Sequence, residues 1–162
     1  MQFILVAKLL ILLSVANGAP VVMKKILRNR LARPLDAGLL FIDGRPLFGP
    51  SKTLRGLTFS ILLTTLASGC IGLGFGFGAL LGAAAMVGDL FSSFVKRRLN
   101  FAPSSMALGL DQIPESAGPL VLASLLVPLT FLDILAATAV FFAGALLLSP
   151  LFYRLKLRDQ PY

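Results

Sequence analysis

The sequence contains no histidine and only one cysteine, Cys70, among its 162 residues. The absence of histidine excludes histidine-based catalytic triads, histidine-ligated metals and a histidine general base. A single thiol makes neither a disulfide within the chain nor a zinc site, so we expect Cys70 to be a small buried apolar side chain. Any enzyme chemistry must therefore use carboxylates, cationic side chains, hydroxyls and hard metal ions.

Acidic residues are also scarce, because 7 Asp and Glu stand against 15 Lys and Arg, for a net charge of +8. A basic balance suits nucleic acid or a membrane surface, but here the positive charges cluster beside long apolar runs. Basic residues in such places orient membrane helices and attract anionic headgroups. We therefore expect membrane lipids and a polyanionic substrate as partners, and no nucleic acid.

Hydrophobic residues make up 57% of the chain, above the roughly 45–50% of soluble domains. A helix needs about 20 residues to span a bilayer. Five apolar segments come close to this length: Phe3–Met23, Leu57–Gly74, Phe75–Val95, Ser116–Leu132 and Ile134–Tyr153. The fourth is the weakest, since it is short and contains Pro119 and Pro128. The sequence predicts an all-α, polytopic integral membrane protein with about five transmembrane helices in one domain, residues 1–162.

The positions of the positive charges predict the orientation. Met1–Ala19 is similar to a secretory signal, but its basic cluster follows the apolar run, the reverse of the order in a signal peptide. We therefore expect a retained helix with its N-terminus outside the cell membrane and the C-terminus in the cytoplasm. The segments Lys24–Gly56 and Lys96–Glu115 and the tail from Arg154 then face the cytoplasm. They hold every Lys and Arg except Lys8, as expected for inward-facing loops.

Glycines recur at four-residue spacing at the start of the third apolar segment, as Gly74, Gly78 and Gly82. Such spacing gives a helix one smooth face and lets two membrane helices pack closely. We expect part of the run Gly72–Gly76 to form an external turn.

The end of the third segment carries the strongest indication of a functional site. Asp89, Ser93 and Lys96 are spaced at i, i+4 and i+7, so they share a helix face, and Arg97 lies beside them. An ionisable group within a membrane span is costly and usually faces the bundle interior or a wet cavity. The run Lys96–Arg98 is also explained as the cytoplasmic end of a span, but that leaves Asp89 unexplained.

Two further segments carry candidate residues. In the loop Ile42–Gly56, Lys52, Thr53 and Arg55 are candidates for binding an anion with the help of exposed backbone amides. An ordinary basic loop remains the alternative, because the glycine and strand of a true phosphate-binding loop are missing, and we interpret Asp43 as a turn residue.

Before the fourth segment, Asp111 and Glu115 are good helix caps when taken singly. Taken with Asp89, they offer a carboxylate site for Mg²⁺.

In order along the chain, three motifs resemble the signature of the CTP-dependent phosphatidate cytidylyltransferases: Gly88-Asp89, Ser93-Phe94-Val95-Lys96-Arg97 and Gly109-Leu110-Asp111-Gln112. The small size and the run Lys52-Thr53-Leu54-Arg55-Gly56 are most similar to the archaeal branch of that family. The chain departs from the bacterial and eukaryotic pattern, because it lacks their glycine-histidine stretch and has Gln112 where they carry arginine.

The resemblance implies a reaction in which CTP and an isoprenoid ether-lipid phosphate, digeranylgeranylglyceryl phosphate, give a CDP-linked lipid and pyrophosphate. It implies that Asp89 and Asp111 bind Mg²⁺ and that Lys96 is catalytic. It also implies that the substrate phosphates are bound by a second group of residues: Lys52, Thr53, Arg55, Ser93 and Arg97. The loops 24–56 and 96–115 would then form the active site with the end of the third span.

Two other classes of protein fit part of the pattern. A small ion or solute transporter also places a charged residue such as Asp89 within the membrane. Against this class, the polar groups gather near one membrane interface, and only Lys8 and Asp133 lie towards the other. A structural membrane subunit is the third class, and it would tolerate the loss of Asp89.

Overall fold

The computed structural model describes residues 2–28 and 30–154. Within these ranges the chain folds into five helices and no strand: α1 (Phe3–Leu27), α2 (Leu54–Cys70), α3 (Phe75–Arg98), α4 (Gln112–Ala123) and α5 (Phe131–Arg154). The predicted all-α class is confirmed. The predicted cytoplasmic tail falls mostly in residues 155–162, outside the described part of the chain.

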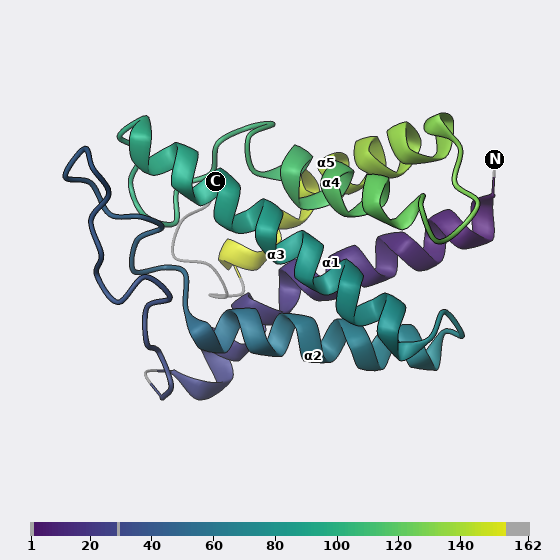
Figure 1. Cartoon of the computed structure of the whole chain (residues 1–162), viewed down its shortest axis with the longest axis horizontal. Helices are drawn as coiled ribbons and strands as arrows, with labels where there is room; N and C mark the ends of the chain where they lie inside the picture. The colour runs from purple at the N-terminus through teal and green to yellow at the C-terminus, as the bar shows by residue number, and fades with distance from the viewer. Residues whose placement is uncertain (1, 29, 155–162) are drawn as a thin grey trace.

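The helices form a bundle in which successive helices run in opposite directions (Figure 1). The first helix, α1, is central and contacts each of the other four. Leu9, Leu12, Leu13 and Ala16 of α1 are fully buried in the core. The N-terminus lies at one end of the bundle, and the long loops after α1 and α3 lie together at the other.

Three of the helices, α1, α3 and α5, are long and apolar enough to cross a membrane, whereas α2 is an apolar helix of 17 residues. Large apolar side chains of these helices point away from the bundle, among them Ile4, Leu62, Val87 and Leu147. An apolar outer surface is expected where a helix faces lipid. The chain is therefore a multi-pass membrane protein.

The prediction of a full span at Ser116–Leu132 is wrong. Helix α4 has 12 residues, about 18 Å at the usual rise, against a hydrocarbon core of about 30 Å. It begins earlier than expected and ends at Ala123, and a non-helical segment, 124–130, leads to α5. Pro128 lies in that segment, where a proline disfavours helical geometry in the residue before it. Pro119, by contrast, lies within α4 and is buried.

Close packing between α2 and α3 confirms the interpretation of Gly78 and Gly82. A Cβ atom added to Gly78 would lie 2.4 Å from the Cβ of Ser68, and one added to Gly82 would lie 3.1 Å from the Cβ of Thr64. Gly74 lies just before α3 and has a φ of 85°, which belongs to the turn between α2 and α3. The expectation that Cys70 is buried is wrong, because its side chain is exposed at the end of α2.

Candidate active site

The C-terminal half of α3 carries the site. Ser93, Lys96 and Arg97 are all buried, with exposed fractions of 2%, 7% and 6%. The Asp89 side chain is 18% exposed and lies on the same helix face as Ser93 and Lys96. Burying this many polar groups is costly unless each has a partner, so the loops around α3 must supply partners.

The loop between α1 and α2 delivers Lys52 to Asp89. The ammonium Nζ of Lys52 lies 2.5 Å from Oδ1 of Asp89, although the two residues are 37 positions apart in the sequence. Burial opposes the charge on Lys52, but the neighbouring Asp89 carboxylate outweighs it and raises the pKa of Lys52. The contact is therefore an ion pair that ties the loop to α3.

Asp36 holds this loop in shape. Its carboxylate accepts hydrogen bonds from the backbone N–H groups of Gly38, Phe48 and Gly49 at 3.1, 3.0 and 2.8 Å. Burial acts to raise the pKa of Asp36, but these three donors favour the carboxylate and leave its pKa below the usual value. Sequence reasoning did not single out Asp36, although an aspartate two residues before a glycine is a common turn pattern.

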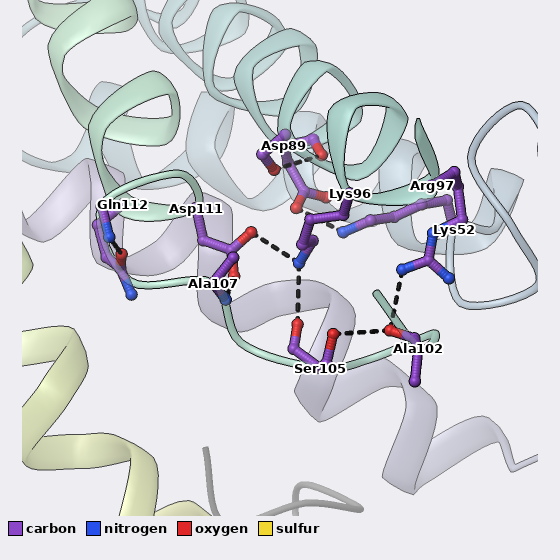
Figure 2. Close-up of polar contacts among 11 residues, drawn as sticks. Lys52, Asp89, Lys96, Arg97, Ala102, Ser105, Ala107, Asp111 and Gln112 are labelled. Carbon is purple, nitrogen blue, oxygen red and sulfur yellow. Dashed lines mark hydrogen bonds and ion pairs between the residues drawn. The ribbon is translucent and has the colours of Figure 1, made fainter. Parts of the chain in front are cut away.

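The loop between α3 and α4 holds two of the three cations at the end of α3, Lys96 and Arg97 (Figure 2). Nζ of Lys96 lies 2.6 Å from Oδ1 of Asp111 and donates to the Ser105 carbonyl at 2.9 Å. Nη2 of Arg97 donates to the Ala102 carbonyl at 2.9 Å. The loop therefore brings together Lys96 and Asp111, two of the predicted catalytic residues.

The start of α4 brings a third carboxyl group. The Glu115 carboxyl group lies beside that of Asp89 and interacts with it, a contact that sequence reasoning left open. Gly88 permits the approach, because a Cβ atom added there would lie 2.2 Å from the Pro114 carbonyl oxygen. A larger residue at position 88 would push α4, and Glu115 with it, away from Asp89.

Two predicted substrate-binding residues, Thr53 and Arg55, make structural contacts. The hydroxyl of Thr53 caps α2 by accepting from the Gly56 N–H at 3.2 Å. The Arg55 guanidinium donates to the carbonyl groups of Arg28 and Arg30 at 2.8 and 2.6 Å, where it closes the end of α1. Contact of Thr53 or Arg55 with substrate stays a prediction, as does the role of Ser93.

The donor set suits a hard divalent cation. Two carboxyl groups in contact, such as Asp89 and Glu115, must share a proton or a cation because like charges repel. Oδ1 of Asp111 is buried and accepts no hydrogen bond, with the Lys96 ammonium as its charged neighbour. No three acidic side chains of the described residues form a ready metal cluster. Mg²⁺ commonly takes its remaining ligands from water and substrate phosphates.

Comparisons with known proteins agree on one family. A family model described as CarS-like, CDP-archaeol synthase, matches residues 66–162. The CDP-archaeol synthase of Thermofilum pendens is 38% identical over 128 residues, which are 76% of this chain and 63% of the relative. That of Pyrobaculum calidifontis is 34% identical over 153 residues, which are 91% of each chain. The alignments thus span under two thirds of the first relative and almost all of the second.

A solved structure has a similar fold. It is described as an intramembrane enzyme for archaeal membrane lipids biosynthesis. The two chains superpose with a TM-score of 0.69 at 28% sequence identity, over 85% of this chain and 90% of the solved one. The likeness therefore covers most of the helix bundle.

Proposed function

The chain belongs to the CDP-archaeol synthase family, and from this premise we propose that it transfers the cytidylyl group of CTP to digeranylgeranylglyceryl phosphate. The products are CDP-archaeol and pyrophosphate. One observation carries the proposal: two lysines and three carboxyl groups, drawn from α3, α4 and both loops, meet at one end of the bundle. This mixture of charges suits a reaction between two phosphate-bearing substrates.

The chemistry needs charge neutralisation and alignment more than a base. The attacking phosphate monoester is already anionic near neutral pH, so a chain without histidine has the groups that it needs. Lys96 and Arg97 would stabilise the phosphate oxygens of CTP, with Lys52 approaching from the loop. A Mg²⁺ ion held by Asp89 and Asp111 supplies further neutralisation of the triphosphate when it is bound.

The basic loops support a site that faces the cytoplasm. The loops that carry Lys52 and Asp111 lie at the end of the bundle opposite the N-terminus (Figure 1), and loops rich in Lys and Arg stay on the cytoplasmic side. CTP would enter from the cytoplasm, and the lipid phosphate would arrive from the bilayer with its headgroup at the interface.

The transporter alternative lacks a path. At the far end of the bundle, Asp133 is bound by the backbone N–H of Gln2 and by Thr130. Its hydrogen bonds serve the ends of helices α1 and α5. No second charged cluster among the described residues continues from Asp89 towards that end, so a transport function has no support here.

The direct test uses the full chain, purified and reconstituted in liposomes. With CTP, Mg²⁺ and the ether-lipid phosphate, we expect release of pyrophosphate and formation of the CDP-linked lipid. Both products should be absent without the lipid phosphate and greatly reduced in the presence of EDTA. An ester-linked phosphatidate of matched chain length tests the preference for ether lipids. Failure to form any CDP-linked lipid would contradict the proposal.

A further inference from the structure

Arg98, the last residue of α3, holds the tip of the loop between α1 and α2. Its Nε lies 2.8 Å from Oδ2 of Asp43, and its Nη2 donates to the carbonyl groups of Pro46 and Arg45 at 2.6 and 3.2 Å. In return, Nη1 of Arg45 donates to the Arg98 carbonyl. The sequence suggested only that Arg98 marks the end of a span.

The same guanidinium also contacts two aromatic rings. Its carbon is 4.9 Å from the ring centre of Phe41, in the loop, and 4.6 Å from that of Phe94, on α3. The two rings pack edge to face, with centres 5.2 Å apart. Only a planar cation with several donors makes these stacking contacts and ion pairs together.

Backbone hydrogen bonds connect this tip to Lys52. The tip is a short hairpin in which the Phe41 N–H donates to the Arg45 carbonyl and the Leu47 N–H to the Leu39 carbonyl. Further along, an isolated bridge joins Pro34 and Thr53. We name residues 34–53 the hairpin loop.

The anchoring of Asp36 completes this frame. Asp36 holds the N–H groups of Phe48 and Gly49, and the Leu35 N–H donates to the Lys52 carbonyl at 2.8 Å. Hydrogen bonds thus hold the hairpin loop together from its tip to Lys52. A displacement of the tip would therefore move the backbone of Lys52 as well.

The hairpin loop wraps around the end of α3. At about 100° per residue, Arg97 lies about 80° around the helix from Asp89, and Arg98 about 180°. Along this path, Lys52 contacts Asp89. Gly49 lies against Arg97, since a Cβ atom added to Gly49 would be 3.6 Å from Nη1 of Arg97. The tip of the loop contacts Arg98, on the side of α3 opposite Asp89.

We propose that Arg98 is a positioning residue that sets Lys52 in the active site by clamping the tip of the hairpin loop to the far side of α3. The inference rests on the proposed function, because Lys52 is assigned there to the phosphates of CTP. Lys52 is a long and flexible side chain, and ordering such a chain costs conformational entropy. Arg98 reduces that cost by fixing the backbone from which Lys52 extends.

A double-mutant cycle tests whether Arg98 acts through Lys52. We expect Arg98→Gln to lower kcat/KM about tenfold, mainly through KM for CTP, and Arg98→Lys to rescue little because lysine lacks the planar fork. In a Lys52→Gln background, the same Arg98→Gln change should cost little more, because the residue that it positions is already gone. Arg33→Gln, which removes a positive charge from an exposed residue of the same connection, is the matched control and should behave like wild type.

Hydrogen exchange of the full chain in detergent gives a readout without turnover. In Arg98→Gln, the amides of Phe41, Leu47 and Gly49 should exchange faster, while those of the core of α1 should not. Full additivity in the cycle, or unchanged exchange in the hairpin loop, would overturn the inference. If wild type makes no CDP-linked lipid, the proposed function fails, and faster exchange would then support the clamp alone.

Discussion

The two ends of the bundle each contain a buried or largely buried aspartate, and the two aspartates differ in their partners. Asp133, at the N-terminal end, is fully buried and is bound by the neighbouring Thr130 and the backbone N–H of Gln2. Asp89, at the loop-rich end, is bound by the Lys52 ammonium and by the carboxyl group of Glu115.

This difference distinguishes the structural role of Asp133 from the chemical role proposed for Asp89. The side chains of Thr130 and Asp133 exchange hydrogen bonds with each other's backbone N–H groups, the pattern of a capping box at the start of α5. Neutral donors of this kind, one of them from the start of α1, satisfy the carboxylate within the fold. Asp89, by contrast, depends on charged groups from distant segments, and such groups can exchange partners when a charged ligand arrives. The partners of an aspartate in a membrane helix therefore indicate whether its role is structural or chemical.

The largest expected effect comes from removing the charge at the loop-rich end. Asp89→Asn should lower turnover of CTP by about 10²–10³-fold, the usual cost of losing a group that stabilises charge in the transition state. The unfolding temperature should change little, because asparagine still accepts a hydrogen bond from Lys52. Product formation in liposomes and thermal unfolding in detergent measure the two quantities. Full activity of Asp89→Asn would mean that Asp89, like Asp133, has only a structural role.

The next effect sharpens the assignment of the second lysine–carboxylate pair. Lys96→Gln should lower kcat/KM by about 10–100-fold, as expected for the loss of charge-assisted hydrogen bonds worth roughly 1.5–3 kcal/mol. The loss should appear mainly as a higher KM for CTP, which steady-state kinetics with varied CTP will show. Lys8→Gln, at the opposite end of the bundle, is the control with the same change of charge. Equal kinetics for the two variants would exclude Lys96 from the site.

The matched change at the other aspartate should reverse the pattern. Asp133→Asn keeps one acceptor but weakens the cap of α5 and its bond to Gln2. We expect the unfolding temperature to fall by about 2–4 °C, the shift that a modest loss of stability produces in a chain of this size, with CTP turnover unchanged. A loss of turnover like that of Asp89→Asn would mean that both ends of the bundle serve the reaction.

The sequence predicted much of this arrangement, and the reasons for its failures are physical. Helical spacing placed Asp89, Ser93 and Lys96 on one face, and small-residue spacing predicted a close helix contact at Gly78, because both patterns are local. Apolar length alone did not predict the early end of α4, since hydropathy does not fix the residue at which a helix ends, and Pro128 disfavours helical geometry just before it.

Contacts between distant segments were the hardest to predict. Nothing in the local sequence shows that Lys52 meets Asp89 or that Glu115 reaches it, because both contacts depend on how the loops fold over α3. Arg98 illustrates the same limit: a basic residue at the end of a span has an ordinary explanation from orientation, and only the folded hairpin loop reveals its aromatic and acidic partners.

The smallest expected effect concerns Asp36 and pH. Its pKa is lowered in the folded chain, so its contribution to the hairpin loop is complete above the unfolded value of about 3.9 and is lost as the pH falls below it. Protection factors of the Phe48 and Gly49 amides, corrected for intrinsic exchange, should therefore fall as the pH drops below about 4. In Asp36→Asn they should be lower at pH 7 and change little with pH. The other acids at this end of the bundle, Asp43 and those of the active site, do not bind the Phe48 and Gly49 amides. A pH response that survives in Asp36→Asn would therefore come from one of them, and the backbone geometry alone would hold the turn at Phe48 and Gly49.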